Sequence, residues 1–202
     1  PREHTSRRDH ILERYLTRGE VQDLLNIPPW TPKGIRDRTI LVLMYFHGLR
    51  ISEVAALSAG DISNGQLHVR AGKGRKDSTL ILIDKTTELI DRWMIERAKV
   101  AGADVSALFV SFSHNQPGTE LTPDGMRIVV NGYMEAAGCK RPGVSCHALR
   151  HAHASHAVAA GVDLVALSLE MGHRSTETTA VYTHIVDAVK QNPAAVLVKK
   201  EG

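Results

Sequence analysis

Apolar residues recur at helical spacing through most of the chain. Thr17-Arg18-Gly19-Glu20 matches a capping box, and Val21, Leu24 and Leu25 follow at helical spacing until Ile27-Pro28-Pro29 ends the helix. The same pattern, with its start and stop signals, predicts further helices over residues 35–47, 51–57, 84–100, 123–138, 145–161 (capped by Ser145), 163–171, and from 175 onward.

Two short segments have the composition of strands instead. Leu67 to Arg70 and Ser78 to Ile83 are predicted strands, joined by a hairpin loop over residues 71–77. Leu108 to Phe112 is apolar but too short to assign to either state. The pattern therefore predicts an α+β fold that is mostly α-helical, with one small antiparallel β-sheet.

Composition and charge narrow the class only slightly. The chain has 202 residues, 43% of them hydrophobic, and a net charge of +3. These values fit a soluble globular protein and permit, without requiring, a nucleic-acid partner. Cys139 and Cys146 form neither a disulfide framework nor a zinc ribbon, and no apolar run is long enough to span a membrane. We therefore expect a cytoplasmic protein with reduced thiols.

The chain divides into three predicted regions. Residues 1–16 are polar and form a linker or N-terminal extension, residues 17–186 form one domain, and residues 187–202 form an amphipathic tail. Because the sequence begins at Pro1 rather than Met, we expect a cut fragment or a processed product, with a further domain upstream.

The first candidate site is the corner Gly48-Leu49-Arg50-Ile51-Ser52-Glu53 between two predicted helices. Arg50 lies beside a helix N-terminus, where outward-pointing N–H groups favour an anion. Glu53 follows one turn later and could orient the guanidinium. Taken alone, the corner fits an ordinary surface Arg–Glu pair better than an anion site.

The second candidate is Lys73, between two glycines in the predicted hairpin loop. Glycines let a backbone approach a ligand closely, and a hairpin tip can carry a lysine into a groove. The alternative is an ordinary exposed turn. The spacing of a phosphate-binding P-loop is absent.

The third candidate is a histidine-rich helix on which His147, Arg150 and His151 share a face. His147 and His151 have the i,i+4 spacing of zinc ligands, but no glutamate lies between them and the helix has no carboxylate ligand. We predict no metal here and keep a zinc hydrolase as a minor alternative. His153 and His156 are expected to be packing or hydrogen-bonding histidines.

Two weaker signals follow, Gly172-His173 and Tyr182. The order and spacing of all five motifs resemble the tyrosine recombinase (phage integrase) family. That family has an arginine corner, a lysine on a β-hairpin, a His-x-x-Arg helix, a Gly-His pair and a tyrosine about nine residues later. The resemblance covers residues 17–190, which makes residues 17–186 a catalytic domain.

This chain departs from the family pattern in places. Met171 replaces the usual leucine before Gly-His, Glu170 replaces a commonly apolar residue, and Leu169 a commonly polar one. The hairpin also lacks a basic residue that the family often keeps, which leaves Lys76 as an alternative to Lys73. The Gly-Lys-Gly context favours Lys73.

The resemblance implies DNA strand cleavage and rejoining. Phosphodiester cleavage needs a nucleophile, positive charge at the two non-bridging oxygens and an acid for the leaving oxygen. Tyr182 would attack phosphorus and form a 3′-phosphotyrosyl link, while Arg50 and Arg150 would hold the non-bridging oxygens.

The remaining roles also come from the resemblance. Lys73 would protonate the leaving 5′-hydroxyl, His147 would help to remove the tyrosine proton, His173 would hydrogen-bond the phosphate, and Glu53 would hold its neighbours in place. No metal or other cofactor is needed in this mechanism.

The resemblance further implies double-stranded DNA as partner, a homotetramer on paired sites, nucleoid association, and an upstream core-binding domain outside this chain. The tail would dock on a neighbouring protomer or fold back on its own. The alternatives are a type IB topoisomerase and a non-catalytic DNA-binding module. Whether the role is phage integration, transposon movement, integron-like shuffling or chromosome-dimer resolution stays open.

Overall fold

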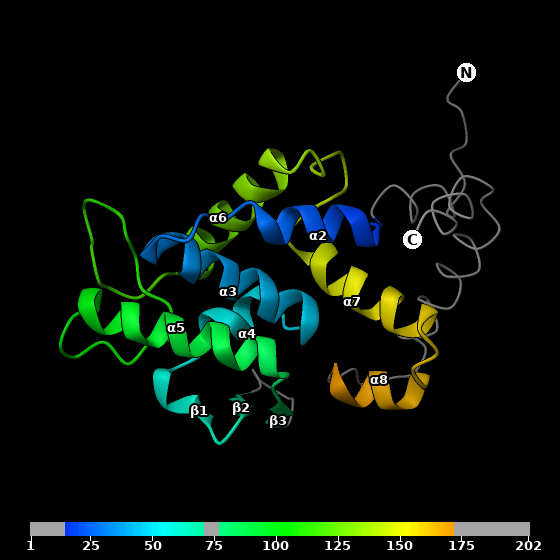
Figure 1. The fold of residues 1–202 in the computed structure, drawn as a ribbon, viewed down its shortest axis with the longest axis horizontal. Coiled ribbons are helices and arrows are strands. Elements are labelled where there is room, and N and C mark those ends of the chain that lie inside the picture. The colour runs from blue at the N-terminus through cyan, green and yellow to red at the C-terminus, as the bar shows by residue number, and fades with distance from the viewer. Residues whose placement is uncertain (1–14, 71–76, 172–202) are drawn as a thin grey trace.

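The computed structural model describes residues 15–70 and 77–171, and Lys73, Gly172-His173, Tyr182 and the tail lie outside the described residues. In this part of the chain, helices form most of the fold, and a small sheet lies along one edge of it, next to α4 and α5 (Figure 1). The helices are α2 (Arg18–Asn26), α3 (Pro32–Phe46), α4 (Ile51–Ala55), the 3-10 helix η1 (Ala59–Asp61), α5 (Asp84–Val100), α6 (Pro123–Ala136), α7 (His147–Ala159) and α8 (Leu164–Glu170).

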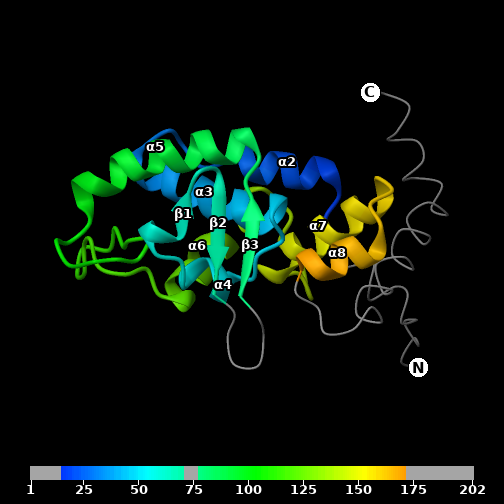
Figure 2. The ribbon, with the colours of Figure 1, turned by 90° about the horizontal axis from the view of Figure 1, so that it is seen from below.

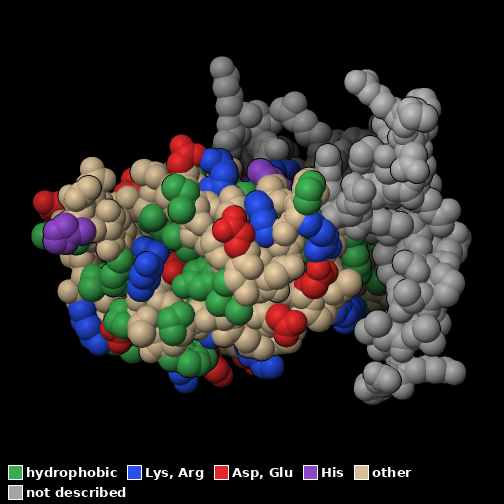
Figure 3. All heavy atoms as spheres, turned by 90° about the horizontal axis from the view of Figure 1, so that it is seen from above, with side chains coloured by type: hydrophobic (Ala, Val, Ile, Leu, Met, Phe, Trp, Pro, Cys, Tyr) green, Lys and Arg blue, Asp and Glu red, His purple; other side chains and the backbone are tan. Residues whose placement is uncertain are grey.

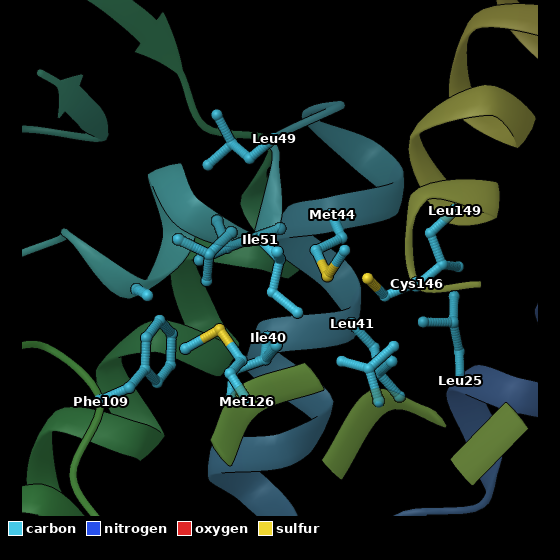
Figure 4. Close-up of a cluster of buried hydrophobic side chains, with 14 of the residues drawn as sticks. Leu25, Ile40, Leu41, Met44, Leu49, Ile51, Phe109, Met126, Cys146 and Leu149 are labelled. Carbon is cyan, nitrogen blue, oxygen red and sulfur yellow. The ribbon is translucent and has the colours of Figure 1, made fainter. Parts of the chain in front are cut away.

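Helix α3 is the centre of the fold. It contacts α2, α4, α5, α6 and α7, and its fully buried side chains include Ile40, Leu41 and Met44. Figure 4 shows these side chains meeting Leu149 of α7 and Met126 of α6. Because apolar residues surround α3 on several sides, this helix fixes the positions of the elements that carry the candidate site.

The sheet has three antiparallel strands in the order β1 (Ile62–Ser63), β2 (Gln66–Val69) and β3 (Ser78–Ile81) (Figure 2). Leu67 pairs with Leu80 in the register of β2 and β3, and both side chains are buried. The hairpin prediction is confirmed, but β1 was missed. Two residues give too short a pattern to reveal a strand, and β1 is recognised only by its pairing with β2.

Most predicted helix ends are confirmed to within a few residues. The Thr17–Glu20 capping box is present, with both reciprocal hydrogen bonds. Helix α3 begins earlier than predicted, because Thr31 caps it and Pro32 occupies its first turn.

The prediction that Ser145 caps the histidine-rich helix is wrong. The residue at the cap position is Cys146, whose backbone is already helical and whose side chain makes no capping hydrogen bond. Ser145 instead accepts a hydrogen bond from the Ala148 N–H through its carbonyl, at 2.7 Å. Helix α7 therefore begins at His147, one residue later than a Ser145 cap would place its start.

The segment that the sequence left unassigned, Leu108 to Phe112, is irregular, with bends at Leu108 and Phe109, and belongs to no named strand or helix. Val110 forms an isolated bridge with Glu120, and the Leu108 carbonyl accepts a hydrogen bond from the Trp93 indole at 2.9 Å. This segment therefore anchors α5 to the core. The mostly helical α+β fold with a small antiparallel sheet is confirmed.

The face seen in Figure 3 carries no segregated charge. Lysine and arginine side chains are interspersed there with aspartate and glutamate. The small net charge of the chain is thus not concentrated into one basic patch on that face.

Candidate active site

Arg50 lies in the short connection between α3 and α4. Its backbone is extended, at φ −73° and ψ 150°, and it occupies the N-cap position of α4. Glu53 reaches back to it, with Oε2 accepting from the Arg50 backbone N–H at 2.8 Å and Oε1 accepting from Nη1 at 2.7 Å. The helix start therefore fixes the guanidinium and the carboxylate together.

Arg150 comes from α7 and meets the same carboxylate. Its Nη1 lies 3.7 Å from Oε2 of Glu53, and the Arg150 side chain is only 8% exposed. Its guanidinium also donates to the carbonyl of Gly48, and to that of Met171 at 2.5 Å. Glu53 thus lies between two arginines that are far apart in the sequence.

Gly48 makes this approach possible. Its φ of +60° lies in the left-handed region, and a Cβ placed there would stand 2.7 Å from Cδ2 of His153. Any other residue would strain the backbone and collide with the ring. The glycine therefore lets the corner lie directly against α7, with its carbonyl facing Arg150.

The carbonyls of Gly48 and Met171 were missed at the sequence level. Both belong to segments that the motifs singled out, but a carbonyl that orients a side chain leaves no side-chain signal in the sequence. The glycine at position 48 is itself a signal in the sequence, because glycine readily adopts the positive φ found at this corner.

His147 is the first residue of α7 and is exposed. Its Nδ1 lies 3.5 Å from Oγ of Ser145 and 3.8 Å from Sγ of Cys146. Arg150, one turn later, is buried, whereas His151 is exposed. The helix therefore presents His147 at the surface while it carries Arg150 into the interior.

One ion pair and one histidine–aspartate contact lie beside the Lys73 loop. Arg70, at the end of β2, lies 2.6 Å from the buried carboxylate of Asp61, and His68 lies 3.7 Å from Asp77. Lys73 itself, like His173 and Tyr182, lies outside the described residues. Gly172-His173 directly follows Met171, whose carbonyl contacts Arg150.

His156 is a hydrogen-bonding histidine of the interior. Its Nδ1 lies 2.9 Å from the hydroxyl of Tyr45 and its Nε2 lies 3.0 Å from that of Tyr15. Burial, followed by the charge of Arg18, lowers the pKa of His156 to about 4. It therefore stays neutral near pH 7 and links residue 15 to α7.

Within residues 15–70 and 77–171, no three histidine, cysteine or acidic side chains are grouped closely enough to bind a metal ion. In the same ranges, no helix has both the length and the apolar character needed to cross a membrane.

The sequence was compared with models of known protein families. The model described as the phage integrase family matches residues 14–188, which is most of the chain. The chain belongs to the phage integrase family.

Curated relatives carry the names of tyrosine recombinases. The chain is 37% identical over 180 residues to tyrosine recombinase XerC 2 of Ralstonia nicotianae, an alignment that covers 87% of this chain and 50% of the relative. It is 33% identical over 195 residues to tyrosine recombinase XerC of Herpetosiphon aurantiacus, covering 93% and 61%. This phage integrase family chain thus spans about half to three-fifths of the length of these relatives.

Solved structures of the family share the fold. The XerH site-specific recombinase bound to a palindromic difH substrate, in a post-cleavage complex, superposes with a TM-score of 0.73 at 26% identity, over 92% of this chain and 54% of that one. The XerA recombinase superposes with a TM-score of 0.74 at 24% identity, over 92% and 63%.

Proposed function

We propose that this chain is the catalytic domain of a site-specific DNA recombinase that cleaves and rejoins strands through a 3′-phosphotyrosyl intermediate. The observation that carries the proposal is the meeting of Arg50 and Arg150 on Glu53. Two guanidinium groups fixed side by side form a preorganised site for the two non-bridging oxygens of one phosphate. The names of the relatives agree with this activity.

The carboxylate of Glu53 has a positioning role in this proposal. Without it, two adjacent cations would repel one another, and their orientation would have to be established anew when DNA binds. With Glu53 between them, Arg50 and Arg150 are already oriented before the phosphate arrives. Their planar forks suit the phosphate better than lysine would.

Tyr182 would attack phosphorus as His147 helps to remove its proton, and Lys73 would protonate the leaving 5′-hydroxyl. His173 would hydrogen-bond the phosphate. Support comes from the family match, which includes these positions. The phosphotyrosyl bond conserves the phosphoester, so a 5′-hydroxyl of another strand can attack it without an external energy source.

We extend the proposal to the partners. Double-stranded DNA is the substrate, and four protomers act on two paired sites. The XerH neighbour was solved with a DNA substrate, which supports the first part. Residues 17–186 are the proposed catalytic domain, residues 1–16 the proposed linker and residues 187–202 the proposed tail, and a core-binding domain would precede the catalytic domain in the whole protein.

The test is covalent trapping on a nicked DNA substrate that releases its 5′-hydroxyl after cleavage. The wild-type protein should form a protein–DNA adduct, and Tyr182→Phe should form none, because only the phenolic oxygen is lost. Tyr133→Phe is the matched control and should still form the adduct. An adduct with Tyr182→Phe would show that another residue is the nucleophile.

A DNA relaxation assay on the wild-type protein distinguishes a recombinase from a type IB topoisomerase. A recombinase exchanges strands between paired sites, whereas a topoisomerase relaxes supercoiled DNA that has no such sites. Relaxation of a plasmid without paired sites, at a rate comparable with adduct formation, would favour the topoisomerase.

A further inference from the structure

His153 connects the arginine site to the corner of the fold. It lies on α7 one turn after Arg150, and its ring packs directly against Gly48. The Gly48 carbonyl accepts a hydrogen bond from Arg150. A displacement of the His153 ring would therefore move one of the two carbonyls that orient the Arg150 guanidinium.

The Nε2 atom of His153 is buried and has no hydrogen-bond partner among the described residues. Burial lowers the pKa of His153, while a hydrogen bond to the Tyr45 backbone raises it. Because Nε2 has no partner, Nδ1 is the nitrogen that bonds to Tyr45, and it does so as a donor to the carbonyl. Nε2 of the neutral ring is then an acceptor that lacks a donor.

Glu170, the last residue of α8, can supply that donor. Its Oε1 lies 4.0 Å from Nε2 of His153, and its side chain is 40% exposed. A movement of about 1 Å would bring the two atoms to hydrogen-bond distance. Partial burial raises the pKa of Glu170. The next residue is Met171, whose carbonyl holds Arg150.

We propose that His153 and Glu170 are positioning residues that share one proton in a hydrogen bond between Nε2 and Oε1. This bond ties α8 to α7 and fixes the carbonyls of Gly48 and Met171 on either side of Arg150. The inference rests on the proposed function, in which Arg150 binds the scissile phosphate.

The groups around His153 favour its neutral imidazole. Arg150 on the same helix lowers the pKa of His153. His153 in turn lowers the pKa of His47, which follows α3, and of His156 on α7. His47 and His156 both have a pKa of about 4 and are neutral near pH 7, so Arg150 is the cation that disfavours an imidazolium at His153. With Nδ1 donating to Tyr45, Nε2 of the neutral ring accepts, and the proposed bond is an O–H of Glu170 donating to Nε2.

The test compares Glu170→Leu with Glu170→Gln in the full chain. At saturating nicked DNA, Glu170→Leu should lower the rate of adduct formation about tenfold, the scale of a small misplacement of a catalytic group. Its affinity for DNA should stay within about twofold, since Arg50 and the rest of the phosphate site are intact. Glu170→Gln should restore most of the rate, because its amide can donate to Nε2.

Two controls make the result specific. Glu88→Leu, the same change at an exposed site on α5, should cleave like the wild type. In a His153→Phe background, Glu170→Leu should add little further loss, because the bond is already absent. A Glu170→Leu protein that cleaves within about twofold of the wild type, or a Glu170→Gln protein as slow as Glu170→Leu, would overturn the proposal.

A second readout does not depend on DNA cleavage. The imidazole nitrogen-15 resonance of His153 Nε2 should shift between the wild type and Glu170→Leu, and little between the wild type and Glu170→Gln. An unchanged resonance in Glu170→Leu would refute the shared proton even in a protein that forms no adduct. Absence of any wild-type adduct, together with the expected shift, would instead refute the proposed function.

Discussion

Two arginine–carboxylate clusters in this molecule differ in one decisive respect. In the first, Arg36 and Asp37 of α3 are 2% and 1% exposed and 2.6 Å apart. The remaining Arg36 Nη1 donates to the Val110 carbonyl, and the second oxygen of Asp37 accepts from the Tyr133 hydroxyl at 3.0 Å. This pair is enclosed, and each charged group has its partners inside the protein.

In the second cluster, Arg50 and Arg150 share Glu53, and the Arg50 side chain remains 21% exposed. Among the side chains of residues 50, 53 and 150, one carboxylate lies between two guanidinium groups, so that positive charge exceeds negative charge. Arginine and carboxylate side chains therefore stabilise the fold when they are buried and their charges balance. The same residue types form a candidate anion site where positive charge exceeds negative charge and the cluster is accessible to solvent.

The largest expected effect comes from breaking the enclosed pair. Arg36→Ala should lower the free energy of unfolding by about 3–5 kcal/mol, because it leaves the Asp37 carboxylate buried without its partner. Urea denaturation measures this loss. Adduct formation, corrected for the folded fraction, should change little. A stability close to that of the wild type would mean that water reaches Asp37.

Removing an arginine from the Arg50–Glu53–Arg150 cluster should lower the rate of cleavage much more than the stability. Arg50→Ala and Arg150→Ala should each lower the rate of adduct formation at least about a hundredfold, the scale of removing one preorganised donor. Arg50→Lys and Arg150→Lys should rescue poorly, because a point charge cannot reproduce the planar fork. Single-turnover cleavage measures both effects.

The stability of Arg50→Ala should differ from that of Arg36→Ala. Its loss in urea should not exceed about 1 kcal/mol, as expected for a partly exposed ion pair. If either lysine variant cleaved at nearly the wild-type rate, the two-arginine site would lose its support.

Tyr133→Phe tests a single hydrogen bond of the buried Arg36–Asp37 pair. It removes one hydrogen bond to Asp37 and should lower stability by about 1–2 kcal/mol. Burial and the nearby Asp37 raise the pKa of Tyr133 to about 12. In the wild type, the corresponding stability is present below pH 10, the usual tyrosine pKa, and is lost as the pH rises toward 12. The difference between wild type and variant in urea should therefore depend on pH only in that range.

The smallest expected effect is that of a chelator. Adduct formation should persist in excess EDTA, because in the proposed mechanism the positive charge at the phosphate comes from Arg50 and Arg150. The measurement is the covalent-trapping rate with and without EDTA. A loss of activity that zinc or magnesium restores would show that a metal ion supplies charge to the site.

Local features were determined by the sequence alone. The Thr17–Glu20 capping box, the α5 helix from Asp84 to Val100 and the β2–β3 hairpin follow from rules that act between residues a few positions apart. The order of the five motifs also pointed to the family that the comparison identified. These features need no knowledge of which elements pack together.

Tertiary structure decided what these local features become. Arg36–Asp37 and Arg50–Glu53 are both short-range arginine–carboxylate pairs in the sequence, and no local rule separates them. Packing of α3 against α6 encloses the first pair, and the approach of α7 to the Gly48 corner adds Arg150 to the second. Burial and the count of partner charges are properties of contacts between distant segments, so only the folded chain distinguishes a structural ion pair from a candidate phosphate site.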